Sequence, residues 1–198
     1  SKSLTRSRKS YNKYTKISHG NDALSNLQQL RFNSDDDLVA KNGTRYDKNK
    51  LLGSGAFGDV YLYVNQSNND DKLAVKIFKK KEKEEEEGKV IEYLTSKSEY
   101  DYCDILPLVT KKDRRNNLVS IMPVMEEVEH GSLTPKEALE AYKQIKKQIN
   151  CLLDYDMLYT DLKPENMMRK GKRYYLADLG SVYSSNLDSD NPSFTYLS

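Results

Sequence analysis

Three glycines stand at the spacing G-x-G-x-x-G in the segment Gly53-Ser54-Gly55-Ala56-Phe57-Gly58-Asp59-Val60. Residues 61–64, which follow, are aromatic or apolar and predict a strand. A dinucleotide-binding fold would require a helix there, and a P-loop would require Lys-Ser/Thr where Asp59 and Val60 stand. The segment therefore predicts a glycine loop inside a strand hairpin, where backbone amides can approach phosphates because no Cβ intervenes. An ordinary glycine hairpin without a ligand is the alternative.

A lysine follows on the next predicted strand. Residues 73–78 read Leu-Ala-Val-Lys-Ile-Phe. The two-residue repeat of a strand puts Ala74 and Lys76 on one face, opposite Val75 and Ile77.

Two later segments carry carboxylates. They are Tyr159-Thr160-Asp161-Leu162-Lys163-Pro164-Glu165-Asn166 and Ala177-Asp178-Leu179-Gly180. Asp161 and Asn166 are five residues apart, and carboxylate and amide oxygens are ligands that suit Mg²⁺. Taken alone, Asp161 and Asp178 could equally be turn residues.

In this order, the segments resemble the eukaryotic-type protein kinase family, over about residues 46–198. The resemblance implies ATP and Mg²⁺ as cofactors. It implies that Asp161 accepts the proton of a substrate hydroxyl and that Lys76 contacts the α- and β-phosphates. Lys163 would neutralise charge on the moving phosphoryl group, and its place two residues after Asp161 is typical of Ser/Thr-directed members. The metal ligands implied are Asn166 and Asp178.

The same resemblance implies a nucleotide site between two lobes. Val60 and Ala74 would cover the adenine, Met125 would line the back of its pocket, and Met168 would form the floor. Backbone groups of Glu126 and Val128, in the hinge, would hydrogen-bond the base. The implied cofactor-binding residues are Gly53, Gly55, Gly58, Val60, Ala74, Lys76, Met125, Glu126, Val128 and Met168.

One acid stands out in the charged run 79–89. Glu87 begins a helical stripe at spacings i, i+3, i+4 and i+7, whose apolar members are Val90, Ile91 and Leu94. The resemblance implies that Glu87 forms an ion pair with Lys76 and shares its catalytic role. Gly88 weakens the predicted helix by about 1 kcal/mol.

The residues before Asp161 depart from the family pattern, because Tyr159 and Thr160 stand where His-Arg is usual. Tyr159 can replace the histidine as a packing element, stacked with Leu179 and Ile91. Thr160 carries no positive charge, so the contact that holds a phosphorylated activation loop loses its usual anchor. Phosphorylation within 181–198 is therefore not expected to be needed.

The resemblance implies an α+β, two-lobed fold of the protein-kinase kind. Residues 1–45 would form a basic, flexible extension, and 46–125 an N-lobe with a small antiparallel sheet and one helix. Residues 126–198 would form the hinge and a partial, mainly helical C-lobe. The helices that cover this lobe in a full kinase are absent, which suggests a truncated polypeptide or a partner protein over the same surface.

One long helix is predicted over 135–153, with Thr134 as its cap and Pro135 at its first position. An apolar stripe along it predicts a core-facing side. Its members are Ala138, Ala141, Tyr142, Ile145, Ile149, Leu152 and Leu153.

Composition sets few further limits. The 198 residues include 32 basic and 30 acidic side chains, a net charge of +2 that by itself implies no nucleic-acid partner. Residues 1–20 hold basic and no acidic side chains, so they are either a solvated tail or an arm for an acidic partner, nucleic acid or a lipid surface. No window approaches the length of an apolar membrane span.

The two cysteines, Cys103 and Cys151, have no metal-ligand spacing and are predicted to be buried free thiols in a reducing compartment. A cytoplasmic location is therefore expected, or a host cell or virion if the source is a virus or pathogen.

Two classes of function remain. The first is an ATP-dependent Ser/Thr protein kinase, a phosphotransferase that acts on a protein substrate. The second is a nucleotide-binding pseudokinase or a scaffold that uses the fold structurally. The first is favoured because Lys76, Asp161, Asn166 and Asp178 are all present.

Overall fold

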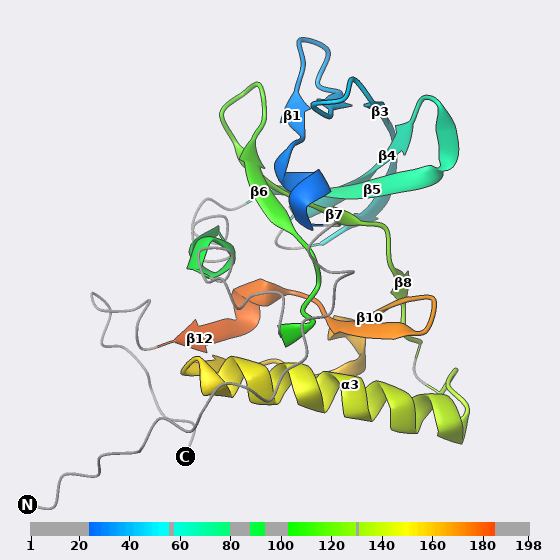
Figure 1. Ribbon diagram of the computed structural model, residues 1–198, viewed down its shortest axis with the longest axis vertical. Helices are drawn as coiled ribbons and strands as arrows, with labels where there is room; N and C mark the ends of the chain where they lie inside the picture. Colours follow the sequence, from blue (N-terminus) through cyan, green and yellow to red (C-terminus); the bar gives the residue numbers. More distant parts are fainter. Residues whose placement is uncertain (1–23, 56–57, 80–87, 94–102, 130, 185–198) are drawn as a thin grey trace, which may run out of the picture.

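The computed structural model describes residues 24–55, 58–79, 88–93, 103–129 and 131–184. A large antiparallel sheet forms the upper part, and one long helix with several short strands forms the lower part (Figure 1). This confirms the two-lobed α+β arrangement, with few helices in the described part of the lower lobe. No helix among the described residues is long and apolar enough to cross a membrane.

The upper sheet has the strand order β1-β2-β3-β4-β5-β7-β6, and all neighbouring strands are antiparallel. The predicted glycine hairpin is present, since Gly53 lies opposite Val60 where β3 pairs with β4. The strands are β1 (Arg31–Phe32), β2 (Leu38–Val39), β3 (Arg45–Ser54), β4 (Gly58–Asn65), β5 (Asn68–Phe78), β6 (Val109–Lys112) and β7 (Leu118–Pro123).

Residues 24–45 are part of the folded upper lobe, which differs from the flexible extension expected there. The hairpin of β1 and β2 adds two strands to the sheet by pairing with β3. Residues 24–28 are helical, and Nζ of Lys111 on β6 donates to the carbonyl oxygen of Gln28 at 2.7 Å. Three leucines at a spacing of three are buried, two on this helix and one after it: Leu24, Leu27 and Leu30. The basic tail, residues 1–20, lies outside the described residues.

Residues 88–93 form a second short helical stretch, which lies to the left of the sheet's lower end in Figure 1. Its Val90 and Ile91 side chains are buried in the core, as their phase predicted. A Cβ at Gly88 would lie only 2.7 Å from Cδ2 of Leu118 on β7, so glycine permits a close approach to the sheet here. Glu87, the predicted partner of Lys76, lies outside the described residues, so that ion pair stays a prediction.

The lower lobe is built on helix α3 (Pro135–Asp154), whose start agrees with the sequence. The Thr134 hydroxyl accepts from the Glu137 N–H at 3.3 Å, and the Glu137 carboxylate accepts from the Thr134 N–H at 2.9 Å, a reciprocal capping box. The apolar stripe is only partly core: Tyr142 and Leu153 are 60% and 49% exposed. A polar side chain, Gln148, is buried instead.

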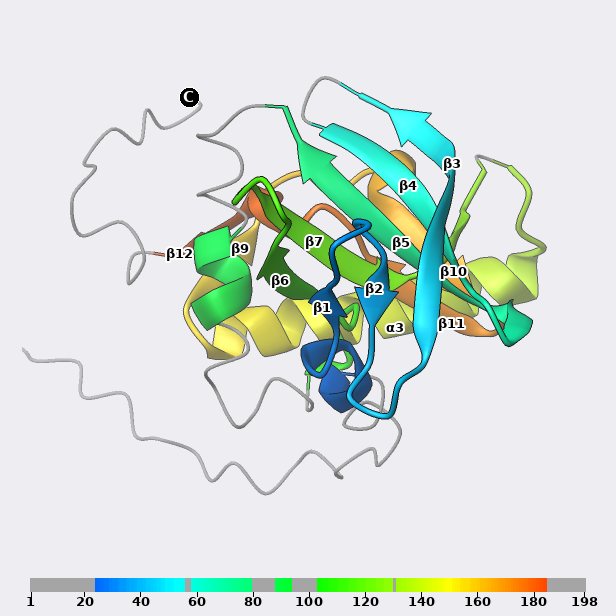
Figure 2. The ribbon, with the colours of Figure 1, turned by 90° about the horizontal axis from the view of Figure 1, so that it is seen from above.

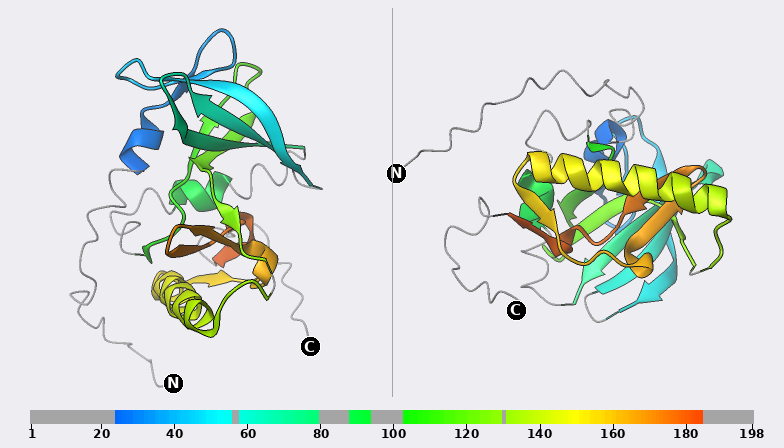
Figure 3. Two further views of the ribbon diagram at one scale, coloured as in Figure 1. Left: turned by 90° about the vertical axis from the view of Figure 1, so that its right-hand side faces the viewer. Right: turned by 90° about the horizontal axis from the view of Figure 1, so that it is seen from below.

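Short strands connect α3 to the cavity between the lobes. One sheet has the order β11-β10-β8 and another pairs β12 with β9 (Figure 2). Viewed from below, α3 crosses beneath these strands (Figure 3). The elements are β8 (Glu126–Glu127), β9 (Met157–Tyr159), the 3₁₀ turn η2 (Pro164–Asn166), β10 (Met167–Lys170), β11 (Arg173–Leu176), the 3₁₀ turn η3 (Leu179–Ser181) and β12 (Val182–Ser184).

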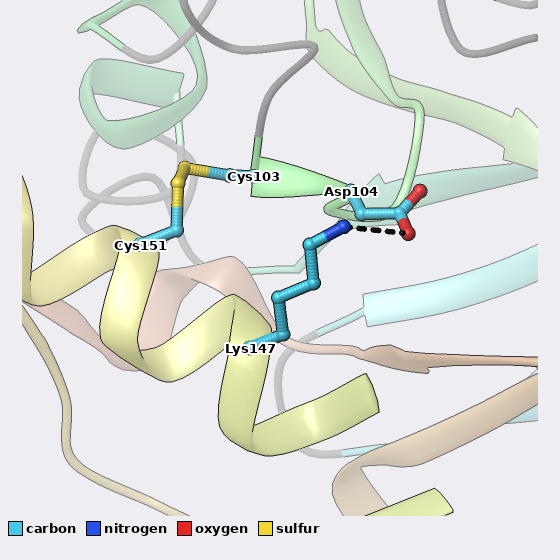
Figure 4. Close-up of a disulfide and its surroundings, with 4 residues drawn as sticks. All are labelled: Cys103, Asp104, Lys147 and Cys151. Atoms are coloured by element: carbon cyan, nitrogen blue, oxygen red, sulfur yellow. Dashed lines mark ion pairs between the residues drawn. A yellow bond between two sulfur atoms is a disulfide. The ribbon is translucent and has the colours of Figure 1, made fainter. Parts of the chain in front are cut away.

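The prediction of two free thiols was wrong, because a disulfide joins Cys103 to Cys151 (Figure 4). Cys103 lies in the segment before β6 and Cys151 lies on α3, so the bond links that segment to the helix. Both cysteines are buried. Beside them, the Asp104 carboxylate lies 3.8 Å from Nζ of Lys147 and 3.5 Å from Nη1 of Arg173. The expectation of a reducing compartment rested on free thiols and loses that support.

Candidate active site

A cavity of about 310 Å³ lies where the two lobes meet. This volume is at the lower end of the range for small-molecule sites, about 300–1,000 Å³. The upper sheet, the segment after β7, and the lower strands all contribute to its wall. Eight of the predicted site residues line it: Gly53, Val60, Ala74, Lys76, Met125, Asn166, Met168 and Asp178.

The walls of the cavity are apolar on two opposite sides. Val60 and Ala74 come from adjacent strands of the upper sheet, while Met168 comes from β10 below. The remaining apolar lining, not predicted from the sequence, is Leu52, Leu106, Leu108, Met122, Pro123, Val124 and Ala177. A slot with two apolar walls is suited to a flat, mainly apolar group such as a nucleotide base.

The three glycines of the loop differ in how much space a side chain would have at each position. A Cβ on Gly53 would meet nothing within 4 Å, and one on Gly55 would only touch the Gly58 carbonyl oxygen at 4.0 Å. A Cβ on Gly58 would lie 2.6 Å from the backbone oxygen of Ile77 on β5. Protein packing therefore requires glycine only at position 58, and open space beside Gly53 and Gly55 fits a phosphate group held by the loop.

Replacing Gly58 by alanine is expected to lower the free energy of unfolding by about 1–3 kcal/mol. The added methyl group would meet a backbone atom of the neighbouring strand, so β4 and β5 must move apart. Urea unfolding without nucleotide measures the effect. Gly53→Ala is the matched control, because its Cβ enters open space, and a loss as large as that of Gly58→Ala would contradict the packing explanation.

Lys79, which was not among the predicted site residues, bonds to three residues of the glycine loop. Nζ of Lys79 lies 2.7 Å from the Asp59 carboxylate and donates to the Ser54 hydroxyl at 2.8 Å and the Gly55 carbonyl at 3.3 Å. Hydrogen bonds from Lys79 and then Ser54 hold the pKa of Asp59 below its ordinary value. The sequence did contain an indication of this contact, because Lys79 directly follows β5, Asp59 lies at the start of β4, and these two strands are neighbours.

The loop around Asp161 is held by two side chains from its own segment. Nζ of Lys163 lies 2.7 Å from Oδ2 of Asp161, and Nδ2 of Asn166 donates to the same oxygen at 2.8 Å. These contacts, led by the Lys163 hydrogen bond, lower the pKa of Asp161, so its carboxylate is charged at neutral pH. Both contacts fall on Oδ2, which leaves Oδ1 without a protein donor in the described part of the chain.

The two predicted metal ligands face the same cavity. Asn166 also donates from Nδ2 to the Asp161 carbonyl at 2.9 Å, so both amide hydrogens are used and the Oδ1 oxygen is the atom available to a metal. The backbone of Ala177 donates to the Asn166 carbonyl at 2.8 Å and so places Asp178 next to Asn166. An amide oxygen and a carboxylate fit Mg²⁺, which usually takes few protein ligands beside waters and phosphates.

Tyr159 and Thr160 fix the backbone on either side of Asp178. The Tyr159 hydroxyl donates to the Ala177 carbonyl, a polar contact beyond the packing role expected for it. Both the N–H and the hydroxyl of Thr160 donate to the Ser181 carbonyl, at 2.9 and 2.8 Å. The expectation that no loop phosphate is required stays a prediction.

The structure does not bring Glu126 and Val128 to the cavity. The Val128 N–H donates to the Met167 carbonyl at 3.3 Å, and Glu126 is paired with Arg169 in the ladder of β8 with β10. Alternate residues of an antiparallel strand direct their backbone groups to the same neighbour. Glu126 and Val128 therefore direct theirs to β10, and Met125 directs its own to the opposite side.

Four further predicted residues are described but are not part of the lining: Gly55, Gly58, Asp161 and Lys163. Asn166, which lines the cavity, bonds to Asp161, and Glu87 falls outside the described residues. Two acidic residues that were not predicted, Glu127 and Glu165, do line the cavity.

Comparison with known proteins identifies one family. A family model described as "Protein kinase domain" matches residues 46–196. Calcium/calmodulin-dependent protein kinase type 1 of Macrobrachium nipponense is 26% identical over 141 residues, which are 68% of this chain and 39% of that protein. Myosin light chain kinase A of Dictyostelium discoideum is 29% identical over 148 residues, which are 68% of this chain and 50% of that protein. Myosin light chain kinase family member 4 of Homo sapiens is 29% identical over 150 residues, which are 67% of this chain and 37% of that protein. The matches thus span half or less of these relatives.

Proposed function

The chain belongs to the protein kinase domain family, and from that premise we propose that it binds Mg-ATP and transfers the γ-phosphoryl group to Ser or Thr hydroxyls of a protein substrate. The observation that carries this proposal is the shared cavity of Lys76, Asn166 and Asp178, lined above and below by apolar side chains. Lys76 would bind the phosphates, and Asn166 with Asp178 would hold Mg²⁺, which would neutralise phosphate charge.

Asp161 lies where it could act on a substrate hydroxyl. Its carboxylate is charged and is oriented by Lys163 and Asn166, so Oδ1 is available to accept the proton of an attacking hydroxyl. Lys163 at this position supports the Ser/Thr class of acceptor, as it does in the kinases that the motif resembles. For the adenine, we propose backbone contacts from Pro123 and Met125 in place of Glu126 and Val128, because both line the cavity.

Mg-ATP is expected to stabilise the folded chain by about 2.7 kcal/mol at a hundredfold excess over Kd, because ligand that binds only the native state shifts unfolding by mass action. Thermal melting with ATP, with and without Mg²⁺, measures this. Asp178→Asn should lose the metal-dependent part of the shift and keep the remainder. A folded protein whose melting is unchanged in every condition would rule out the proposed nucleotide site.

Exposed apolar side chains on α3 support the proposal of a protein partner over the C-lobe. Leu139 and Tyr142 are 54% and 60% exposed on this helix. A partner that covers this face should slow backbone hydrogen exchange over residues 138–143 further than the helix does by itself. Equal exchange of the isolated chain and of the complete protein in its native assembly would contradict this proposal.

A further inference from the structure

Strand β11 lies at the edge of its sheet, and two glutamines of α3 bond to its outer side. Its inner side pairs with β10. On the outer side, Gln144 accepts from the Tyr174 N–H at 2.9 Å and donates to the Lys172 carbonyl at 3.1 Å. Gln148 accepts from the Leu176 N–H at 3.0 Å and donates to the Tyr174 carbonyl at 2.7 Å. Figure 2 shows α3 running beside this strand.

The spacing of the glutamines matches the spacing of the strand. Four residues of an α-helix advance about 6 Å. Two residues of a strand, the repeat at which backbone groups face the same edge, advance about 6.6 Å. Gln144 and Gln148 therefore meet successive outward-facing groups of β11 and replace a missing neighbour strand.

The two glutamines differ in their surroundings. Gln148 is only 1% exposed, and both of its bonds are buried. Gln144 is half-buried and bonds nearer the start of β11, where water can substitute for its amide. A buried backbone group that loses its partner is costly, whereas a group near solvent is not.

Gln148 acts at the end of β11 that leads to the metal site. Leu176, which donates to Gln148, is two residues before Asp178. Between them, Ala177 donates to the carbonyl of the other proposed ligand, Asn166, at 2.8 Å. The position from which Asp178 enters the cavity is thus fixed on one side by Asn166 and on the other by Gln148.

We propose that Gln148 is a positioning residue for the metal site, which holds the end of β11 so that Asp178 and Asn166 share one Mg²⁺. The proposal rests on the proposed function of the cavity. It assigns Gln148 no contact with nucleotide or substrate.

The test compares Gln148→Met with Gln144→Met, two variants that keep the side-chain length and remove the amide. Gln148→Met should raise the Mg²⁺ concentration needed for half-maximal ATP binding by about tenfold, because it removes both buried hydrogen bonds to β11 and part of their combined effect falls on the metal site. Binding of ATP without Mg²⁺ should change less than about twofold, and Gln144→Met should change the Mg²⁺ requirement by less than about threefold. An unchanged Mg²⁺ requirement in Gln148→Met, or an equal rise in both variants, would overturn the proposal.

Two additions keep the test decisive. If Gln148→Met does not fold, Gln148→Asn keeps the amide but draws it back from β11 by one methylene, so it should also raise the Mg²⁺ requirement; no change would overturn the proposal. If the wild-type chain binds no Mg-ATP, the proposed function has failed by itself. Hydrogen exchange at Leu176 and Ala177 then decides the positioning role: faster exchange in Gln148→Met than in Gln144→Met supports it, and equal exchange overturns it.

Discussion

Asp161→Asn is expected to reduce phosphoryl transfer by about 10²- to 10⁴-fold while ATP binding is retained, because a positioned general base typically contributes a factor of that size. Asparagine keeps the size of the side chain and can still accept from Lys163. It cannot take up a proton from the substrate hydroxyl. The side chain is 43% exposed and outside the cavity lining, so nucleotide binding should not depend on it.

The measurement is the single-turnover rate of γ-phosphoryl transfer from ATP to a Ser- or Thr-containing protein, beside the affinity for Mg-ATP. Asp70→Asn, an exposed aspartate in β5, is the matched control and should match the wild type. Transfer within about twofold of wild type in Asp161→Asn would refute the assigned role. If the wild-type chain binds Mg-ATP and transfers no phosphoryl group to any acceptor, it is a nucleotide-binding pseudokinase or scaffold and not an active kinase.

The pH dependence of transfer follows from the same carboxylate. Its pKa is depressed below the ordinary value of 3.8, first by the hydrogen bond from Lys163. The charged, proton-accepting form therefore persists as pH falls and is lost only below that value. Asp161 should contribute no loss of activity between neutral pH and the ordinary range of a carboxylate.

Removing the disulfide between Cys103 and Cys151 is expected to lower the free energy of unfolding by about 4 kcal/mol. The bond closes a loop between residues separated by 48 positions, and opening it restores conformational freedom to the unfolded chain. The native contacts of Asp104 with Lys147 and Arg173 would remain and hold the same junction.

Urea unfolding of the oxidised chain, the reduced chain and a Cys103→Ala/Cys151→Ala variant measures this effect. The reduced chain and the variant should agree, since both lack the cross-link. Adding reductant to the variant is the control and should change nothing. Two thiols that react with a labelling reagent in the native, unreduced chain would show that the cross-link is absent and that the prediction is wrong.

Elements whose cause is local could be predicted from the sequence. The hairpin around Gly53 and Gly58 follows from glycine spacing and the branched residues after it. The start of α3 follows from Thr134 and Pro135, and in the structure Thr134 and Glu137 cap each other's backbone N–H. The shared face of Ala74 and Lys76 follows from the two-residue repeat of a strand. In each case the deciding neighbours lie close together in the chain.

Features that join distant segments required the tertiary structure. The bond between Cys103 and Cys151 depends on α3 packing against the segment before β6, and no spacing in the sequence indicates that. Residues 24–45 are ordered by pairing with β3 and by Lys111, 83 positions from Gln28, although a flexible extension was expected over residues 1–45.

Register and packing decided the remaining details. The register of the pairing with β10 decides which backbone groups of residues 125–128 face the cavity. Alternate residues face β10, so a shift of the register by one residue would exchange them with the residues that face the cavity. Gln148 resembles a surface residue in a charged helix until β11 presents an unpaired edge to it. The sequence by itself determined the local elements and the chemistry of the motifs, because those depend on neighbours in the chain. The tertiary structure alone decided which distant residues pair, because pairing depends on which hydrogen-bonding groups are left unsatisfied and come within bonding distance.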